Sequence, residues 1–211
     1  MPAKLTTICY VYSCTERIIQ EYTVKDITGI VKLKDDKDDE LSNIIYLNIK
    51  AFIPLNDSSN NFIEAFQTGD VIYLKGKFVA RDSYYTVSAT SIKVLEFDFE
   101  DMPALGINVT IVGITTQIVQ NTGNDLTLEF YVKEKVGNRE PSNFWVETKH
   151  NANNKYLSNK TVTINQNVRS TTAILVRTIT YQRENEATAG KHIVLLEDIS
   201  MINMNRNNSS A

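Results

Sequence analysis

Two neighbouring segments in the second half of the sequence place large aromatic residues among lysines. Tyr131, Lys133 and Lys135 occupy alternate positions in one segment. In the next segment, Trp145 and Lys149 are separated by an even number of positions. Because successive residues of a β-strand point to opposite faces, each set would lie on one face of its strand. Aromatic rings stack on bases and lysines contact phosphates, so this pattern predicts a surface that binds single-stranded nucleic acid.

Other segments carry the same combination of aromatic and basic residues. In the first half they alternate along two β-rich segments, and in the second half they flank a polar loop at residues 184–191. Tyr84 and Tyr85 begin another predicted strand, so alternation must direct one of the two outward. The additional predicted contact residues are Tyr46, Lys50, Phe52, Lys75, Lys77, Arg81, Tyr84, Arg177 and Tyr181.

Other interpretations of these residues stay open at this point. Tryptophan is usually mostly buried, so Trp145 could belong to the core instead of the surface. The net charge of −3 argues against a protein that coats duplexes and favours a protein-binding surface. Dividing the sequence after Leu105 leaves an acidic first part, with a run from Asp35 to Glu40 that we expect to be a solvated loop, and a slightly basic second part. We therefore expect the second part to carry most of the affinity for nucleic acid.

The sequence offers little for catalysis or for metal binding. It contains no glycine-rich phosphate loop, no His-Glu-x-x-His motif and no Gly-x-Ser-x-Gly motif. The two cysteines and two histidines fit no zinc-finger spacing. We therefore predict that the protein is not an enzyme and uses no cofactor or metal ion. No apolar run resembles a signal peptide or a membrane span, so we expect an intracellular protein without membrane contact.

Alternation of apolar and polar residues predicts a chain that is almost entirely β. Runs of five β-rich segments occur twice, separated by an acidic stretch with proline and glycine from Glu96 to Gly106. The segments are residues 6–13, 22–32, 45–53, 72–81 and 84–89, and then 109–119, 126–133, 144–149, 171–181 and 192–202.

A short helix is predicted between the third and fourth strands of the first half. Asn61 can cap it, and Glu64 follows three residues later, as in a capping box. Phe62 and Phe66 form an apolar i,i+4 pair, and Gly69 is placed to end the helix. In the second half, a polar, asparagine-rich stretch at residues 150–160 takes the position of this helix.

Five strands with a connector between the third and fourth predict a five-stranded OB-fold barrel, because closure removes the exposed edges of a sheet. The repeated order predicts two such barrels in tandem. We place the first domain at residues 1–100 and the second at residues 101–211.

The stretch from Phe52 to Phe97 resembles the OB domains of the replication protein A family. The similarity is carried by the predicted helix followed by Gly69-Asp70-Val71 and the apolar strand that runs to Phe78. The resemblance implies tandem barrels that bind single-stranded DNA in the nucleus, with weak sequence preference. The zinc insert with four cysteines, found in some members, is absent.

Single-stranded DNA or RNA is therefore the predicted partner, held by base stacking and phosphate contacts. OB folds also serve as protein-binding modules. The alternative function is an OB-fold scaffold in a DNA-maintenance complex, with another OB-fold protein or a second copy of the chain as partner.

Overall fold

A computed structural model describes residues 2–33, 44–55, 62–137, 143–165, 171–184 and 189–202. Strands account for most of these residues, and the helix α1 (Lys155–Asn165) is the α-helix found among them. The prediction of an all-β fold is confirmed. The acidic run from Asp35 to Glu40 lies outside the described residues.

The first five strands pair in a closed ring. The pairings run from β1 to β2, β3, β5 and β4 and return to β1. All of these pairs are antiparallel except β3 with β5, which is parallel. Every strand of the ring therefore has a partner on both sides over part of its length. The strands are β1 (Ala3–Ile19), β2 (Tyr22–Lys32), β3 (Ile44–Pro54), β4 (Val71–Ala80) and β5 (Tyr84–Leu95).

The second half repeats this order of pairing. It runs from β6 to β8, β9, β11 and β10 and returns to β6, and β9 with β11 is the parallel pair. The contact between β6 and β8 is one residue pair, Ile114 with Tyr131. The strands are β6 (Ile107–Thr115), β7 (Gln120–Thr122), β8 (Asp125–Lys133), β9 (Asn143–Asn151), β10 (Thr171–Gln182) and β11 (Lys191–Ile202).

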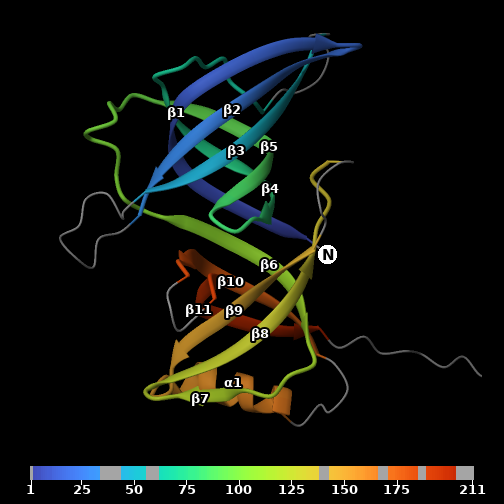
Figure 1. Cartoon of the computed structure of the whole chain (residues 1–211), viewed down its shortest axis with the longest axis vertical. Coiled ribbons are helices and arrows are strands. Elements are labelled where there is room, and N and C mark those ends of the chain that lie inside the picture. The colour runs from blue at the N-terminus through green and yellow to red at the C-terminus, as the bar shows by residue number, and fades with distance from the viewer. Residues whose placement is uncertain are drawn as a thin grey trace, which may run out of the picture.

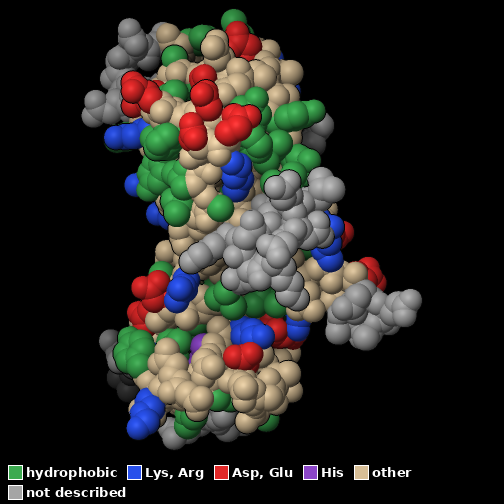
Figure 2. Space-filling view, turned by 90° about the vertical axis from the view of Figure 1, so that its left-hand side faces the viewer, with side chains coloured by type: hydrophobic (Ala, Val, Ile, Leu, Met, Phe, Trp, Pro, Cys, Tyr) green, Lys and Arg blue, Asp and Glu red, His purple; other side chains and the backbone are tan. Residues whose placement is uncertain are grey.

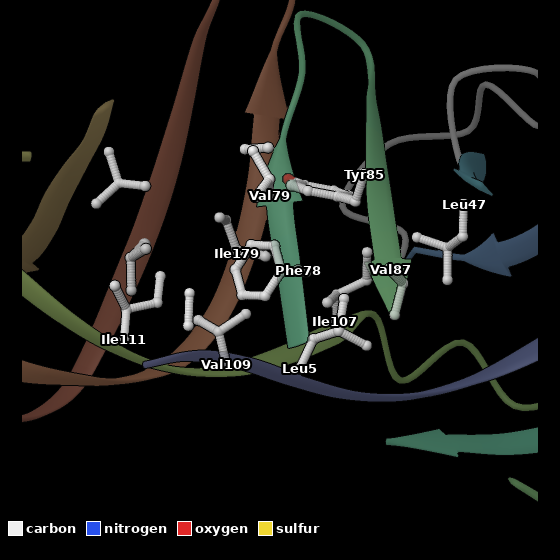
Figure 3. Packing of buried hydrophobic residues seen from close by; sticks show 14 of the residues in the cluster. Leu5, Leu47, Phe78, Val79, Tyr85, Val87, Ile107, Val109, Ile111 and Ile179 are labelled. Carbon is white, nitrogen blue, oxygen red and sulfur yellow. The ribbon is translucent and has the colours of Figure 1, made fainter. Parts of the chain in front are cut away.

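The two rings are joined through a seam, the pairing of residues 3–6 of β1 with residues 108–111 of β6. In Figure 1 the first ring lies above the second along the long axis, and β6 crosses between them. Figure 3 shows Leu5 and Phe78 of the first half beside Ile107 and Ile179 of the second. Because these side chains are fully buried, the two halves share one hydrophobic core.

The stretch from residue 96 to residue 106, which we expected to separate the domains, packs against the first half. Met102 is buried, and the ring of Phe99 lies 5.0 Å from that of Tyr10, centroid to centroid. The N–H of Gly106 also donates a hydrogen bond to the carbonyl of Lys32. This connection is therefore part of the packed structure.

The helix predicted between β3 and β4 is wrong for residues 62–67, and its expected cap Asn61 lies outside the described residues. Backbone hydrogen bonds tie Phe62 and Glu64 to Ile92 of β5, so this segment runs as an extended chain beside that strand. Phe66 is buried, but Phe62 is exposed. The helix was one part of the similarity to replication protein A domains. The other part, the strand from Val71 and the hairpin that follows it, is present as β4 and β5.

A helix forms instead at the corresponding position of the second half. The side chain of Asn154 caps α1 by accepting a hydrogen bond from the N–H of Leu157 at 3.2 Å. Leu157, Thr161 and Ile164 form its buried face at helical spacing. Figure 1 places α1 at the end of the molecule farthest from the first half.

Candidate nucleic-acid interface

A hollow of about 370 Å³ lies on the outer face of β1, β2, β3 and β5. Lys50, Asp26 and Tyr84 are among the residues that line it. Asp26 is engaged by Arg17, with 2.9 Å between Nη1 and Oδ2. The remaining wall offers mostly hydroxyl and amide groups, so the hollow suits a polar ligand. These groups belong to Ser13, Thr15, Thr28, Asn48 and Thr86.

Two further hollows lie where the first half meets the second. One, of about 540 Å³, is lined by residues that include Tyr46, Ser83, Tyr181 and Arg183. The other, of about 330 Å³, lies between the turn after β4 and the starts of β9 and β11, and its lining includes Tyr181 and Trp145. Because Tyr181 lines both, the two hollows adjoin.

Aromatic residues connect all three hollows. Tyr46 and Tyr84 are opposite each other in the parallel pair of β3 and β5, which links the first hollow to the second. Tyr131 is opposite Trp145 in β8 and β9, with ring centroids 5.4 Å apart in an edge-to-face arrangement. We call this succession the aromatic row: Tyr84, Tyr46, Tyr181, Trp145 and Tyr131.

The orientation of Trp145 follows the predicted alternation. Its side chain is 53% exposed, whereas Phe144 and Val146 on either side are buried. The alternative that Trp145 belongs to the core is therefore wrong. Tyr85 is fully buried, so Tyr84 is the outward residue of the adjacent tyrosines.

Cations lie beside the row at several points. Lys133 and Lys135 are exposed at the end of β8 and just beyond it, and Lys50 lines the first hollow. Lys149 is engaged in an ion pair with Asp125, at 2.9 Å. On the face drawn in Figure 2, acidic side chains gather toward the end of the first half that lies away from the second. Carboxylates also line the hollows at the junction, Asp82 in the third and Glu184 in the second.

Carboxylates also occur on the same face of β8 and β9. Glu129 and Glu147 are directly opposite each other, two positions along the strands from Tyr131 and Trp145. Glu147 forms an ion pair with Lys191, with Oε2 and Nζ 2.7 Å apart. This face therefore has mixed charge. Its aromatic rings are well placed to contact bases, but its charged side chains do not form a continuous positive track for phosphates.

The fold resembles that of solved single-stranded DNA binding proteins. A deletion mutant of the single-stranded DNA binding protein from Thermus aquaticus aligns with 99% of this chain and 98% of its own, with a TM-score of 0.55 and 10% identity. The wild-type protein aligns with 96% and 93%, with a TM-score of 0.51 and 12% identity. The chains share a fold.

No protein-family model matches the sequence. No curated protein matches it either.

Some predicted contact residues lie away from the aromatic row. Lys75 and Lys77 belong to β4, which β5 separates from β3. Arg177 is exposed at a bulge of β10, with φ of 145°, opposite Val109 of β6. Phe52 lies near the other end of β3 from Tyr46, with its ring centroid 6.4 Å from that of Tyr22.

The structure also adds two residues that the sequence analysis did not select. Ser83 lines the second hollow, together with Arg183 next to the predicted polar loop, and Lys191 lines the third beside Arg81, which was predicted. Their sequence signal was their position: each lies in or next to a predicted turn between the last two strands of its half. Alternation alone gave them no more weight than other surface residues.

A buried histidine connects the two halves beneath the third hollow. The carbonyl of Arg81 can only accept, so Nε2–H of His192 donates to it at 2.8 Å. Nδ1 then accepts from the hydroxyl of Tyr85 at 3.1 Å. Burial lowers the pKa of His192 from 6.5 to about 4, although its hydrogen bond to Arg81 acts in the opposite direction. The imidazole is therefore neutral near pH 7.

This histidine should make stability depend on pH. The folded-state pKa is the lower one, so below pH 6.5 the unfolded chain binds a proton that the folded chain does not. We expect the free energy of unfolding to fall as pH drops from 6.5 to about 4, by roughly 3 kcal/mol from this group. Urea unfolding across that range would measure it. The variant His192→Gln should show a correspondingly shallower dependence; an identical slope in both proteins would contradict the assignment.

The described residues hold no group of three or more His, Cys, Asp and Glu side chains placed to bind a metal ion. None of the described segments forms a helix with the length and apolar character that crossing a membrane requires.

Proposed function

We propose that this chain binds single-stranded DNA along the aromatic row, and that each ring of strands is an OB barrel. The observation that carries the proposal is the continuity of the row through three adjoining hollows across both halves. The fold shared with single-stranded DNA binding proteins supports it.

The row explains how a strand would be held. Bases can stack on its rings whatever their identity, because every base has a π-face, so we expect weak sequence preference. Lys50, Arg183 and Lys133 lie beside successive parts of the row and would contact phosphates. Because these residues come from both halves, affinity would depend on the whole chain and not mainly on the basic second half.

Binding to labelled oligonucleotides tests the proposal. We expect a single strand of about 30 nucleotides, near the combined upper range for two OB folds, to bind more tightly than a duplex of the same sequence. Fluorescence anisotropy over a salt series should give a log–log slope near −2, from about three phosphate contacts at roughly 0.7 each. Equal affinity for duplex and single strand, or no binding at any salt, would contradict it. An RNA of the same sequence, compared in parallel, decides which nucleic acid is preferred.

Exposed apolar side chains favour one alternative, a protein-binding scaffold in a DNA-maintenance complex. Ile18, Ile19 and Tyr22 are exposed at the end of the hairpin formed by β1 and β2. A partner protein or a second copy would cover them. The assignment to the replication protein A family and the intracellular, nuclear location stay predictions.

A further inference from the structure

A group of lysines lies on the outer face of β1, β4 and β5, apart from the aromatic row. Lys4 of β1 is directly opposite Lys77 of β4, and Lys75 lies two residues from Lys77 on the same face. Lys93 of β5 is opposite Tyr73, the next outward residue of β4. All four lysines are exposed, and we call them the lysine face.

The charge of this face is poorly compensated. Among the described residues, only Lys77 of the four has an acidic partner, Glu134, with Nζ and Oε1 3.8 Å apart. That carboxylate also accepts a hydrogen bond from the buried N–H of Ala3 at 3.0 Å. Like charges directly opposite each other destabilise a sheet. The repulsion between Lys4 and Lys77 is therefore a cost to the fold that a bound anion would relieve.

The neighbours of the lysine face suit phosphate better than bases. Around the lysines the outward positions carry hydroxyl or amide groups, which donate hydrogen bonds to phosphate oxygens. The aromatic ring of Tyr73 is already contacted by Lys75, whose Nζ lies 5.4 Å from its centroid. The polar neighbours are Thr6, Ser88, Ser91, Asn108 and Thr110.

The lysine face is connected to one end of the aromatic row. Glu134, which contacts Ala3 and Lys77, follows β8 directly. Lys133 and Lys135 flank it and are exposed. Tyr131, the last member of the row, lies two residues before Lys133 on the same strand. Basic side chains therefore continue from the row, around the end of β8, to β1 and β4.

We propose that the lysine face is a second nucleic-acid contact, which binds the sugar–phosphate backbone of a strand after it leaves the aromatic row past Lys133. This inference rests on the proposed function. The contact is electrostatic and independent of base identity. Only strands long enough to extend beyond the row reach it, so the effect of removing it depends on the length of the strand.

The test compares two oligonucleotide lengths with a triple variant. The variant is Lys4→Gln/Lys75→Gln/Lys93→Gln. For a strand of about 40 nucleotides, the slope of log affinity against log salt concentration should become shallower by about 2, at roughly 0.7 per phosphate contact. A strand of about 12 nucleotides, within the range of one OB fold, should bind within about twofold of the unchanged protein. Lys77 is retained because it contacts Glu134.

The charge-conserving variant Lys4→Arg/Lys75→Arg/Lys93→Arg is the matched control and should keep the full slope. Circular dichroism and thermal unfolding monitor folding, and the glutamine variant should be at least as stable as the unchanged protein because it relieves like-charge repulsion. An unchanged slope for the long strand in the glutamine variant would overturn the inference and leave the proposed function standing. Equal losses for both lengths would also overturn it, because the lysines would then act on the row itself. Absence of binding by the unchanged protein would overturn both proposals.

Discussion

Replacing Trp145 with alanine is expected to weaken binding of a single-stranded oligonucleotide by roughly ten- to a hundredfold, because each stacked base contributes about 1–3 kcal/mol. Trp145 is a residue of the aromatic row; it lines the third hollow and contacts Tyr131 edge to face. Its side chain is half exposed, so its removal should leave the core intact. Fluorescence anisotropy titration measures the loss.

Phe62→Ala is the matched control for this prediction. Phe62 is also an exposed aromatic residue, but it lies beside β5 and does not line the hollows of the row. The Phe62→Ala protein should bind the oligonucleotide with the affinity of the unchanged protein. Similar losses in both variants would mean that general surface apolarity, and not the row, holds the strand. Unfolding of the Trp145→Ala protein would show that the residue supports the core.

Replacing Phe78 with alanine should have the largest effect on stability, a loss of about 3–5 kcal/mol. Phe78 is fully buried, and its ring centroid lies 5.7 Å from that of Tyr85 and 5.6 Å from that of Phe144. Tyr85 belongs to the first half and Phe144 to the second, so the cavity would open in the shared core. We therefore expect both halves to unfold together at a lower denaturant concentration.

Two spectroscopic signals can check this. The chain has a single tryptophan, Trp145, so its fluorescence reports on the second half, whereas far-ultraviolet circular dichroism reports on both. The two transitions should coincide and shift together in Phe78→Ala. A shift confined to circular dichroism would mean that the halves unfold independently. Phe97→Ala, at an exposed position, should move neither signal appreciably.

Alternation predicted the faces of single strands well. In β9 it separated the buried Phe144 and Val146 from the exposed Trp145, and it required one of Tyr84 and Tyr85 to face outward, which in the structure is Tyr84. This works because the period of two is a local property of the extended backbone. The bounds predicted for β2 coincide with those of the structure.

The helix prediction for the first half failed because the decisive contacts are distant in sequence, and α1 was not predicted because its pattern is weak. Residues 62–64 bond to Ile92 of β5, and the carboxylate of Glu64, expected in a capping box, accepts from the N–H of Val94 instead. Conversely, the buried face of α1 includes the polar Thr161. A search for apolar residues at helical spacing therefore does not detect this helix.

The assembly of the site could not be read from local pattern either. The third hollow depends on the turn at Arg81 meeting the start of β11, and the hydrogen bond between Arg81 and His192 joins residues 111 positions apart. Nothing in either segment alone indicates this contact. The same reasoning explains why Lys75 and Lys77 were predicted as contacts together with Tyr46 and Lys50, since the order β3–β5–β4 places β5 between the two pairs of residues.

The seam between β1 and β6 bears on how long a bound single-stranded DNA would stay on the protein. The two halves are packed together and not joined by a flexible linker, so DNA held by one half would meet the other at a fixed, high effective concentration. When bases leave one half, the other keeps them within reach, so rebinding competes with escape. Residence time should therefore rise steeply once a strand is long enough to touch both halves, while the association rate changes little.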